Sequence, residues 1–318
     1  MKQNRNRSIF NIFLVFLIQV PMILNSQPKN NYFLKQEFDL AGNHTEETQY
    51  FEMKSKLITL ALDGKRIGTD IFRLYLKYNP SRNGIQEAGK YTCVHFSLQL
   101  VDSPEVEIPA LRNWTYIFND TTGNKKEQVF GIDHEKFENL IDSEGNPLPF
   151  DKAYHVYNAF IDFHAFCNIF AESAPDGKGI QDLRKINQKI IHDAAFSEPQ
   201  TNLGKNISEG SFFKNGEITL EFKGLSVVNE KQCALIGVDS GESAFKMIMH
   251  PAENMEIITV GSSHYKGDIY KDLVSNWVQK VTFDEMVVAE TKLNVPPHKI
   301  NSVIERSICI KNIGNVKM

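Results

Sequence analysis

One stretch, residues 151–172, constrains the fold of this 318-residue chain more than any other feature. Its sequence, DKAYHVYNAFIDFHAFCNIFAE, predicts one long helix that is apolar around most of its circumference. Polar residues such as Asp162 interrupt the stretch, and a charge at a bilayer centre is costly, so a membrane span is disfavoured. The helix is therefore expected to be buried in the protein, with one apolar side formed by Val156, Phe160, Phe163, Cys167 and Phe170.

A narrow polar stripe runs along the same helix through Asp151, His155, Asn158 and Asp162. It predicts a solvent-facing or hydrogen-bonded edge or, as the alternative, a polar line that points into a pocket. His155 and Asp162 lie about 10 Å apart along the helix axis at the usual rise per residue. This separation is too large for a direct catalytic dyad.

Strand-like sequence flanks the helix on both sides. In the N-terminal β-rich region, 50–149, the pair Asp63–Gly64 separates two such runs and predicts a hairpin, because glycine accepts the positive φ of a tight turn. Alternation within a half-buried antiparallel sheet is expected to direct one set of side chains to a single face: Val94, Phe96, Leu98 and Leu100.

The C-terminal region, 199–318, consists of short alternating runs separated by Gly, Asn, Asp or Pro, which favours a meander of antiparallel strands. Between the two β-rich regions lies a central helical region, 150–198. It includes a second, amphipathic helix expected over roughly Ile180 to Ala195. The order predicts an α+β protein, predominantly antiparallel β-sheet, with two central α-helices packed on or between sheets.

The N-terminus has the order of a signal peptide. Lys2, Arg5 and Arg7 precede an apolar run from Ile9 to Leu24, and Asn25–Ser26 offers a cleavage zone. Residues 1–26 are therefore expected to be a signal peptide, 27–49 a polar N-terminal arm, and the mature protein exported to the periplasm or outside the cell. Removal of the three cations changes the net charge from -4 to -7 (-4 minus 3), with no transmembrane anchor left.

Four cysteines, Cys93, Cys167, Cys233 and Cys309, form no CxxC pair. In an exported protein they permit two disulfides with three connectivities. Each also lies in an apolar stretch, which suits a buried free thiol equally well. Both alternatives stay open at this point.

Two short motifs contain catalytic residue types. GVDSGES carries Asp239, Ser240, Glu242 and Ser243, but it lacks the GxSxG elbow of a serine hydrolase and is expected to be a turn. GSSHYKGD, residues 261–268, contains His264 and Tyr265, which together offer hydrogen bonds and apolar surface to a ligand. A plain β-turn or bulge explains this motif as well.

A metal site would have to recruit residues from separate elements, because no HExxH or EF-hand pattern occurs. The candidates are Asp162, His164, His192, Asp193 and His264. Neighbours such as Asp162 and His164 point to different sides of a helix. No metal site or cofactor is therefore predicted. The acidic net charge and the lack of phosphate-binding motifs disfavour nucleic acid and nucleotide partners.

These features favour an exported, non-enzymatic binding or envelope-associated protein that holds a hydrophobic small molecule or lipid between a curved sheet and the central helices. The ligand-binding residues expected from the helix and the GSSHYKGD motif are His155, Tyr157, Phe160, Phe163, His164, His264 and Tyr265. The alternatives are a secreted hydrolase, acting with or without the assistance of a metal ion, and a structural or adhesive surface protein. The ligand and the oligomeric state do not follow from the sequence.

Overall fold

The structure is a computed structural model that describes residues 35–80, 89–120, 122, 128–199 and 208–314. The chain divides into two units, 1–36 and 37–318, and every element named below belongs to the second. The predicted signal peptide, 1–26, lies outside the described residues.

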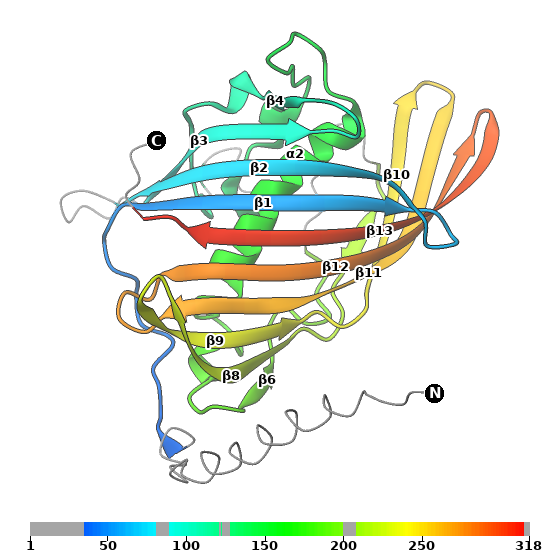
Figure 1. Cartoon of the computed structure of the whole chain (residues 1–318). Coiled ribbons are helices and arrows are strands. Elements are labelled where there is room, and N and C mark those ends of the chain that lie inside the picture. The colour runs from blue at the N-terminus through cyan, green and yellow to red at the C-terminus, as the bar shows by residue number, and fades with distance from the viewer. Residues whose placement is uncertain (1–34, 81–88, 121, 123–127, 200–207, 315–318) are drawn as a thin grey trace, which may run out of the picture. The chain divides into compact units, whose positions relative to one another are not determined.

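The described residues form one 13-stranded sheet whose pairings are antiparallel throughout (Figure 1). The main strand order is β4-β3-β2-β1-β13-β12-β11-β9-β8-β6, while β5 pairs with β3, and β10 pairs with β11 and β7. The strands are β1 (Gln49–Leu60), β2 (Arg66–Asn79), β3 (Lys90–Gln99), β4 (Glu105–Glu107), β5 (Trp114–Ile117), β6 (Lys189–Ile191), β7 (Phe212–Lys214), β8 (Thr219–Val228), β9 (Lys231–Asp239), β10 (Ser243–Ala252), β11 (Met255–Asp272), β12 (Val278–Asn294) and β13 (Pro297–Asn312).

Pairing between β1 and β13 joins the two β-rich regions into this one sheet. The register runs from Phe51 opposite Asn312 to Leu60 opposite Val303. The predicted hairpin at Asp63–Gly64 is confirmed, because β1 and β2 pair antiparallel around it and Gly64 has a φ of 82°. The Asp63 carboxylate also accepts a hydrogen bond from the amide of Lys65, which stabilises the turn.

The predicted alternation in β3 is wrong at Val94. Tyr91 and Cys93 face the core, and so do Phe96 and Leu98. The first two are odd-numbered positions and the last two are even-numbered, so unbroken alternation cannot place all four on one face. A register shift opposite Tyr75 and Leu76 accounts for the change, since Tyr75 pairs with His95 and Leu76 with Cys93. Val94 is the extra residue of a β-bulge, and a bulge transfers the buried face from one parity to the other.

One helix packs against the sheet, and Figure 1 shows it crossing several strands on one face. α2 (Phe150–His164) continues into a π-helical turn, η5 (Ala165–Ile169). Its aromatic side chains contact distant strands. The ring centre of Phe163 lies 5.1 Å from that of Phe51 on β1, and the ring of Phe166 stacks on that of Phe283 on β12 with 4.1 Å between ring centres. Short 3-10 turns complete the described helical segments: η1 (Pro109–Leu111), η3 (Val129–Gly131), η4 (His134–Phe137) and η6 (Ile180–Asp182).

The prediction of two central helices is wrong, because the segment 180–195 forms no α-helix. It contains η6, a bend at Asn187 with a φ of 69°, and the short strand β6, which pairs with β8. The side chain of Gln188 accepts hydrogen bonds from the amides of Arg184 and Lys185 and donates one to the carbonyl of Asp182. These bonds satisfy backbone groups that a helix would otherwise pair, so the spaced apolar residues reach the core from an irregular segment.

Two hairpins extend past the rest of the sheet, where Figure 1 draws them in yellow and in orange to red. We call these residues the sheet extension: Ser243–Ala252 of β10, Met255–Ser263 of β11, Met286–Asn294 of β12 and Pro297–Ile304 of β13. The side of the sheet that carries α2 is called the inner face, and the opposite side the outer face.

Candidate ligand-binding site

The predicted ligand residues Phe160 and Phe163 lie in the core between α2 and the sheet. Both are at most 1% exposed. The ring of Phe160 lies within 6 Å of four other aromatic rings, those of Phe96, Trp114, Tyr116 and Phe137. Side chains of the protein itself therefore fill the helix–sheet interface at this level. Ligand binding by these residues stays a prediction.

Tyr157 and His155 lie farther toward the start of α2. Tyr157 is buried beside Phe137, and its hydroxyl has no hydrogen-bond partner among the described residues. Burial raises the pKa of this phenol above its usual value. His155 is half-buried beside Phe72, at 5.8 Å between ring centres, and burial lowers the pKa of its imidazole to about 4. Both side chains are therefore uncharged at neutral pH.

His164 is fully buried in a hydrogen-bonded network between α2, β3 and β5. Its Nδ1 lies 2.8 Å from Oδ1 of Asn168, and its Nε2 lies 2.8 Å from the hydroxyl of Tyr116. The Asn168 amide nitrogen donates to Tyr91 and Glu172, so its oxygen must accept from Nδ1. The imidazole is thus neutral with its proton on Nδ1, and burial lowers its pKa to about 3.

Acidification is expected to destabilise the protein through His164. In the unfolded chain this imidazole titrates near pH 6.5, whereas its folded-state pKa is about 3. The unfolded state therefore binds the proton first, and the free energy of unfolding falls as the pH drops below about 6.5, by up to about 1.4 kcal/mol per pH unit. The test is His164→Gln, whose amide can replace both hydrogen bonds. Urea denaturation at several pH values gives the slope of the free energy of unfolding against pH, and in this variant the slope should correspond to about one proton fewer taken up on unfolding. An unchanged slope would contradict the assignment.

The polar stripe of α2 contains a buried ion-pair cluster that joins the helix to the sheet. Asp162 forms a salt bridge with Arg306 on β13, and Arg306 also contacts Glu285 on β12 at 2.6 Å. The side chains of all three are at most 13% exposed. Burial raises the pKa of Asp162 to about 6 although Arg306 opposes this, and the two carboxylates raise the pKa of Arg306. The stripe is thus a hydrogen-bonded edge at this position.

His264 and Tyr265 are neighbours on β11 and therefore point to opposite faces. His264 lies on the outer face, where its Nε2 is 2.7 Å from Oδ1 of Asp239. Tyr265 lies on the inner face, with its ring centre 6.2 Å from that of Phe166. The structure thus separates His264 from the predicted site residues on α2 and places Tyr265 near the end of that helix.

GVDSGES forms the turn between β9 and β10. Gly241 has a φ of 58°, and Ser240 is fully buried, with its hydroxyl donating to the carbonyl of Gly241 and accepting from the amide of Tyr265. Both roles are structural. Within the described residues, no three His, Cys, Asp or Glu side chains are grouped to hold a metal ion.

All four cysteines are free thiols, and Cys93, Cys167 and Cys233 are buried. Burial raises the pKa of Cys93 to about 12 and that of Cys233 to about 11, and the pKa of Cys167 is also raised. Because the thiolate is the reactive form, these three side chains are chemically inert at neutral pH.

The inner face of the sheet extension carries many apolar side chains and no Asp, Glu, Lys or Arg among its described residues, although His298 lies on it opposite Leu293. Strand register places Phe245, Gly261, Ala289 and Ser302 in one row across the four strands, and Met247, Thr259, Thr291 and Ile300 in the next. Among the described side chains of the extension, every Asp, Glu, Lys and Arg within the strands lies on the outer face: Lys246, Glu256, Glu290, Lys292 and Lys299. Apolar side chains also lie on the outer face, where Val260, Met286 and Val288 are 40%, 43% and 51% exposed, so the two faces differ in charge and not in the presence of apolar side chains.

This inner face is much less buried than its continuation beneath α2. Ile269, Phe283 and Ile308 lie on that continuation and are at most 2% exposed. On the extension, Ile300 is 45% exposed, and Phe245, Met247, Met249, Ile257 and Leu293 are half-buried. A contiguous group of partly exposed apolar side chains on a face without Asp, Glu, Lys or Arg suits an interaction site.

Sequence reasoning missed this surface, although the alternation that encodes it is visible in SAFKMIMH and MEIITVG. A period of 2 indicates which residues share a face, but not whether a helix covers that face. Half of the eight methionines of the chain lie in the extension: Met247, Met249, Met255 and Met286. That clustering is the signal that could have pointed to it, because methionine is overused at adaptable binding surfaces.

No protein-family model matches the sequence, and no curated protein matches it. Among solved structures, the chain is similar to an anion-selective porin from Comamonas acidovorans, with 10% sequence identity over 84% of this chain and 99% of that chain. The TM-score is 0.16, which is too low to support an argument about fold, function or location. No helix within the described residues is long and apolar enough to cross a membrane.

Proposed function

We propose that this protein is an exported, non-enzymatic binding protein that holds lipid acyl chains on the inner face of the sheet extension. The observation that carries the proposal is the segregation of charge, which leaves one half-buried face of the extension without Asp, Glu, Lys or Arg among its described residues. Export rests on the signal peptide predicted over residues 1–26. An apolar ligand would remove this face from water, at about 25 cal/mol for each Å² of apolar surface.

The composition of the face favours a flexible aliphatic ligand over a protein. Protein interfaces concentrate their binding energy in Trp, Tyr and Arg. The inner face of the extension has none of these three and consists largely of Met, Ile, Leu, Val, Thr and Phe. Methionine side chains such as those of Met247 and Met249 adapt to ligands of variable shape. These properties suit acyl chains, whose conformations vary.

The hydrolase alternative depended on His264 joining Asp162, His164 or His192. His264 lies on the outer face, paired with Asp239, whereas Asp162 and His164 lie on the helix at the inner face. His192 is buried against Phe170. The observed geometry therefore gives the hydrolase alternative no support.

Two neighbouring substitutions on β11 test the proposal. Ile257 lies on the inner face opposite Met249 and Leu293, and Ile258 lies on the outer face opposite Lys292. We expect Ile257→Glu to weaken binding of the fluorescent fatty acid cis-parinaric acid at least about tenfold, because a charge on the ligand surface costs more than about 1.4 kcal/mol. Ile258→Glu should leave binding within about twofold, since its carboxylate faces a lysine.

The full chain would be used, with thermal melting of both variants as the control for folding. Denaturing extraction of the wild-type protein, followed by mass spectrometry, should also release fatty acids or phospholipids. Equal binding by the two folded variants, or no fatty-acid binding by the wild type, would refute the proposal. A change in oligomeric mass that is confined to Ile257→Glu would point instead to a protein partner.

A further inference from the structure

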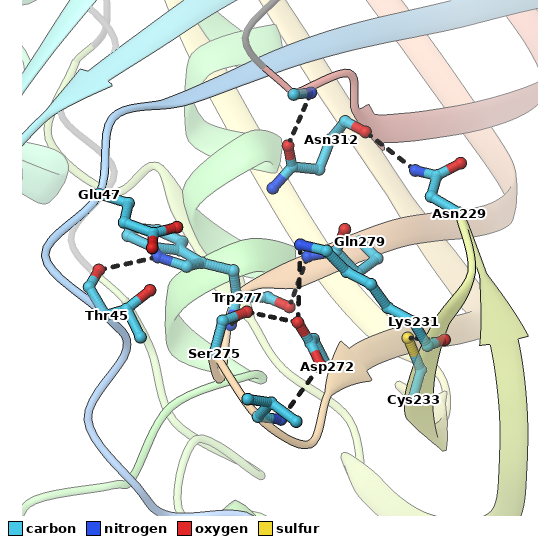
Figure 2. Close-up of polar contacts among 12 residues, drawn as sticks. Thr45, Glu47, Asn229, Lys231, Cys233, Asp272, Ser275, Trp277, Gln279 and Asn312 are labelled. Atoms are coloured by element: carbon cyan, nitrogen blue, oxygen red, sulfur yellow. Dashed lines mark hydrogen bonds and ion pairs between the residues drawn. The ribbon is translucent and has the colours of Figure 1, made fainter.

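A polar pocket lies at the end of the sheet that is remote from the tips of the sheet extension. Its volume is about 620 Å³, within the range of small-molecule sites. Residues at the start of β1, in the β8–β9 turn, at the start of β12 and at the end of β13 line it, and Figure 2 shows Asn229, Gln279 and Asn312 among them. This pocket is separate from the apolar face proposed to hold lipid.

Buried side-chain amides form a rigid wall of the pocket. Asn312, which is 4% exposed, donates to Oε1 of Gln49 at 2.7 Å, and its side-chain oxygen accepts from the amide of Gly314. The backbone carbonyl of Asn312 accepts a further hydrogen bond from the side-chain amide of Asn229 at 3.2 Å. Gln279 is 2% exposed, and its amide nitrogen donates to the carbonyl of Trp277. Buried amides held by hydrogen bonds within the protein keep their positions in the absence of a ligand.

The β8–β9 turn directs Asn229 toward this wall. Asn229 and Glu230 have φ values of 50° and 63°, the pattern of a tight two-residue hairpin with two left-handed residues. Glycine is the usual choice at the second position, so Glu230 adopts its conformation at a cost of roughly 1 kcal/mol or more. The turn places Asn229 and Lys231 on either side of the strained residue, and both line the pocket.

The charge of the pocket is opposite to that of the whole protein. Three lysines line it, Lys231, Lys280 and Lys311, with Glu47 as the one lining carboxylate among the described residues. Lys231 lies 3.6 Å from the buried carboxylate of Asp272, which offsets part of its charge. The chain as a whole carries a net charge of -4. A basic pocket in an acidic protein attracts anions selectively.

Two of the lysines face each other across neighbouring strands, and their like charges repel unless an anion lies between them. Lys280 on β12 lies directly opposite Lys311 on β13, and like charges at such positions destabilise a sheet. Lys311 has Glu52 as its neighbour on β1, but that carboxylate accepts a hydrogen bond from Tyr75. Lys280 is placed 5.3 Å from the ring of Tyr270. Both ammonium groups therefore have donor capacity left for a bound anion.

We infer that this pocket binds a small organic anion, with a carboxylate or phosphate group held between Lys280 and Lys311. Its volume leaves room for a ligand of about monosaccharide size. The carboxylate and phosphate forms of such a ligand share the same recognition chemistry, an anion beside two ammonium groups.

Isothermal titration of the full chain with three probes tests the inference. Glucuronate supplies a carboxylate, glucose 6-phosphate supplies a phosphate, and glucose has neither charge. We expect at least one of the two anions to bind and glucose to bind at least about tenfold more weakly, because a charged hydrogen bond contributes more than about 1.4 kcal/mol. The stronger of the two anions identifies the group that the pocket recognises. Added salt should weaken binding.

The double variant Lys280→Ala/Lys311→Ala should reduce the affinity for that anion at least about tenfold. The matched control, Lys292→Ala/Lys299→Ala, removes the same charge on the sheet extension, where both lysines pair with Glu290. It should leave the affinity within about twofold. Failure of both anions to bind, equal binding of glucose, or equal loss in the two double variants would overturn the inference.

Discussion

Replacing Arg306 with methionine is expected to lower the free energy of unfolding by about 3–5 kcal/mol. The substitution leaves the carboxylates of Asp162 and Glu285 buried and close to each other without their cation. Methionine fills a similar volume, so the loss reports on charge and not on packing. Urea denaturation at neutral pH measures it. Arg66→Met removes an exposed arginine whose side chain bonds to the nearby Thr69, and should change stability by less than about 0.5 kcal/mol.

Acidification distinguishes uncompensated charge from lost contacts in this variant. Burial raises the pKa of Asp162 to about 6 in the presence of Arg306, and without the cation its pKa must rise further. A raised carboxyl pKa destabilises the fold above that pKa and ceases to do so once the group is protonated. The deficit of Arg306→Met relative to wild type should therefore shrink as the pH falls from the higher pKa of Asp162 in the variant toward about 6, and change little below that.

The triple variant Asp162→Asn/Glu285→Gln/Arg306→Met removes all three charges together. It should recover most of the stability lost in the single variant, because a neutral cluster carries no unpaired buried charge. A loss below about 1 kcal/mol in Arg306→Met would mean that the three charges are not buried together as described.

Replacing Phe160 with alanine is the second large expected effect, a loss of about 3–5 kcal/mol. Its ring is fully buried among four other aromatic rings, and the surrounding sheet and helix cannot collapse into the space that it leaves. Denaturant unfolding provides the measurement. Phe150, at the start of the same helix, is 44% exposed, so Phe150→Ala should lose much less.

This pair of variants also tests where a ligand binds. If Phe160 belongs to the core, its removal lowers stability, and cis-parinaric acid still binds to the folded fraction. If the helix–sheet interface were the ligand site, Phe160→Ala would weaken fatty-acid binding with little loss of stability. The second result would return the site to the residues that the sequence predicted on α2.

The long helix and the antiparallel strands were predictable because their signals are local. Residues such as Phe160 and Phe163 recur at helical spacing, and Asp63–Gly64 marks a tight turn wherever it lies. The segment 180–195 misled the prediction because its apolar residues also recur at helical spacing. Buried side chains of an irregular segment can share that spacing by coincidence, and the left-handed φ of Asn187 is not visible in the sequence.

The candidate sites could not be predicted, because they join residues that are remote in the chain. Arg306 lies 144 residues from Asp162, and Asn312 lies 263 residues from its partner Gln49. The ligand residues predicted on α2 have suitable chemistry, but Phe160 and Phe163 are enclosed by side chains from other elements. Whether an aromatic side chain binds a ligand or fills a core depends on those neighbours.

The sequence by itself determined the local structure: one long apolar helix, alternating strands, their first hairpin, and the faces that most side chains share. The tertiary structure decided which of those faces are covered. Beneath α2 the inner face of the sheet is a closed core around Phe283, whereas beyond Glu285 and Arg306 the same face becomes accessible. Alternation depends only on backbone geometry within a strand, but burial depends on whether a distant element reaches that face.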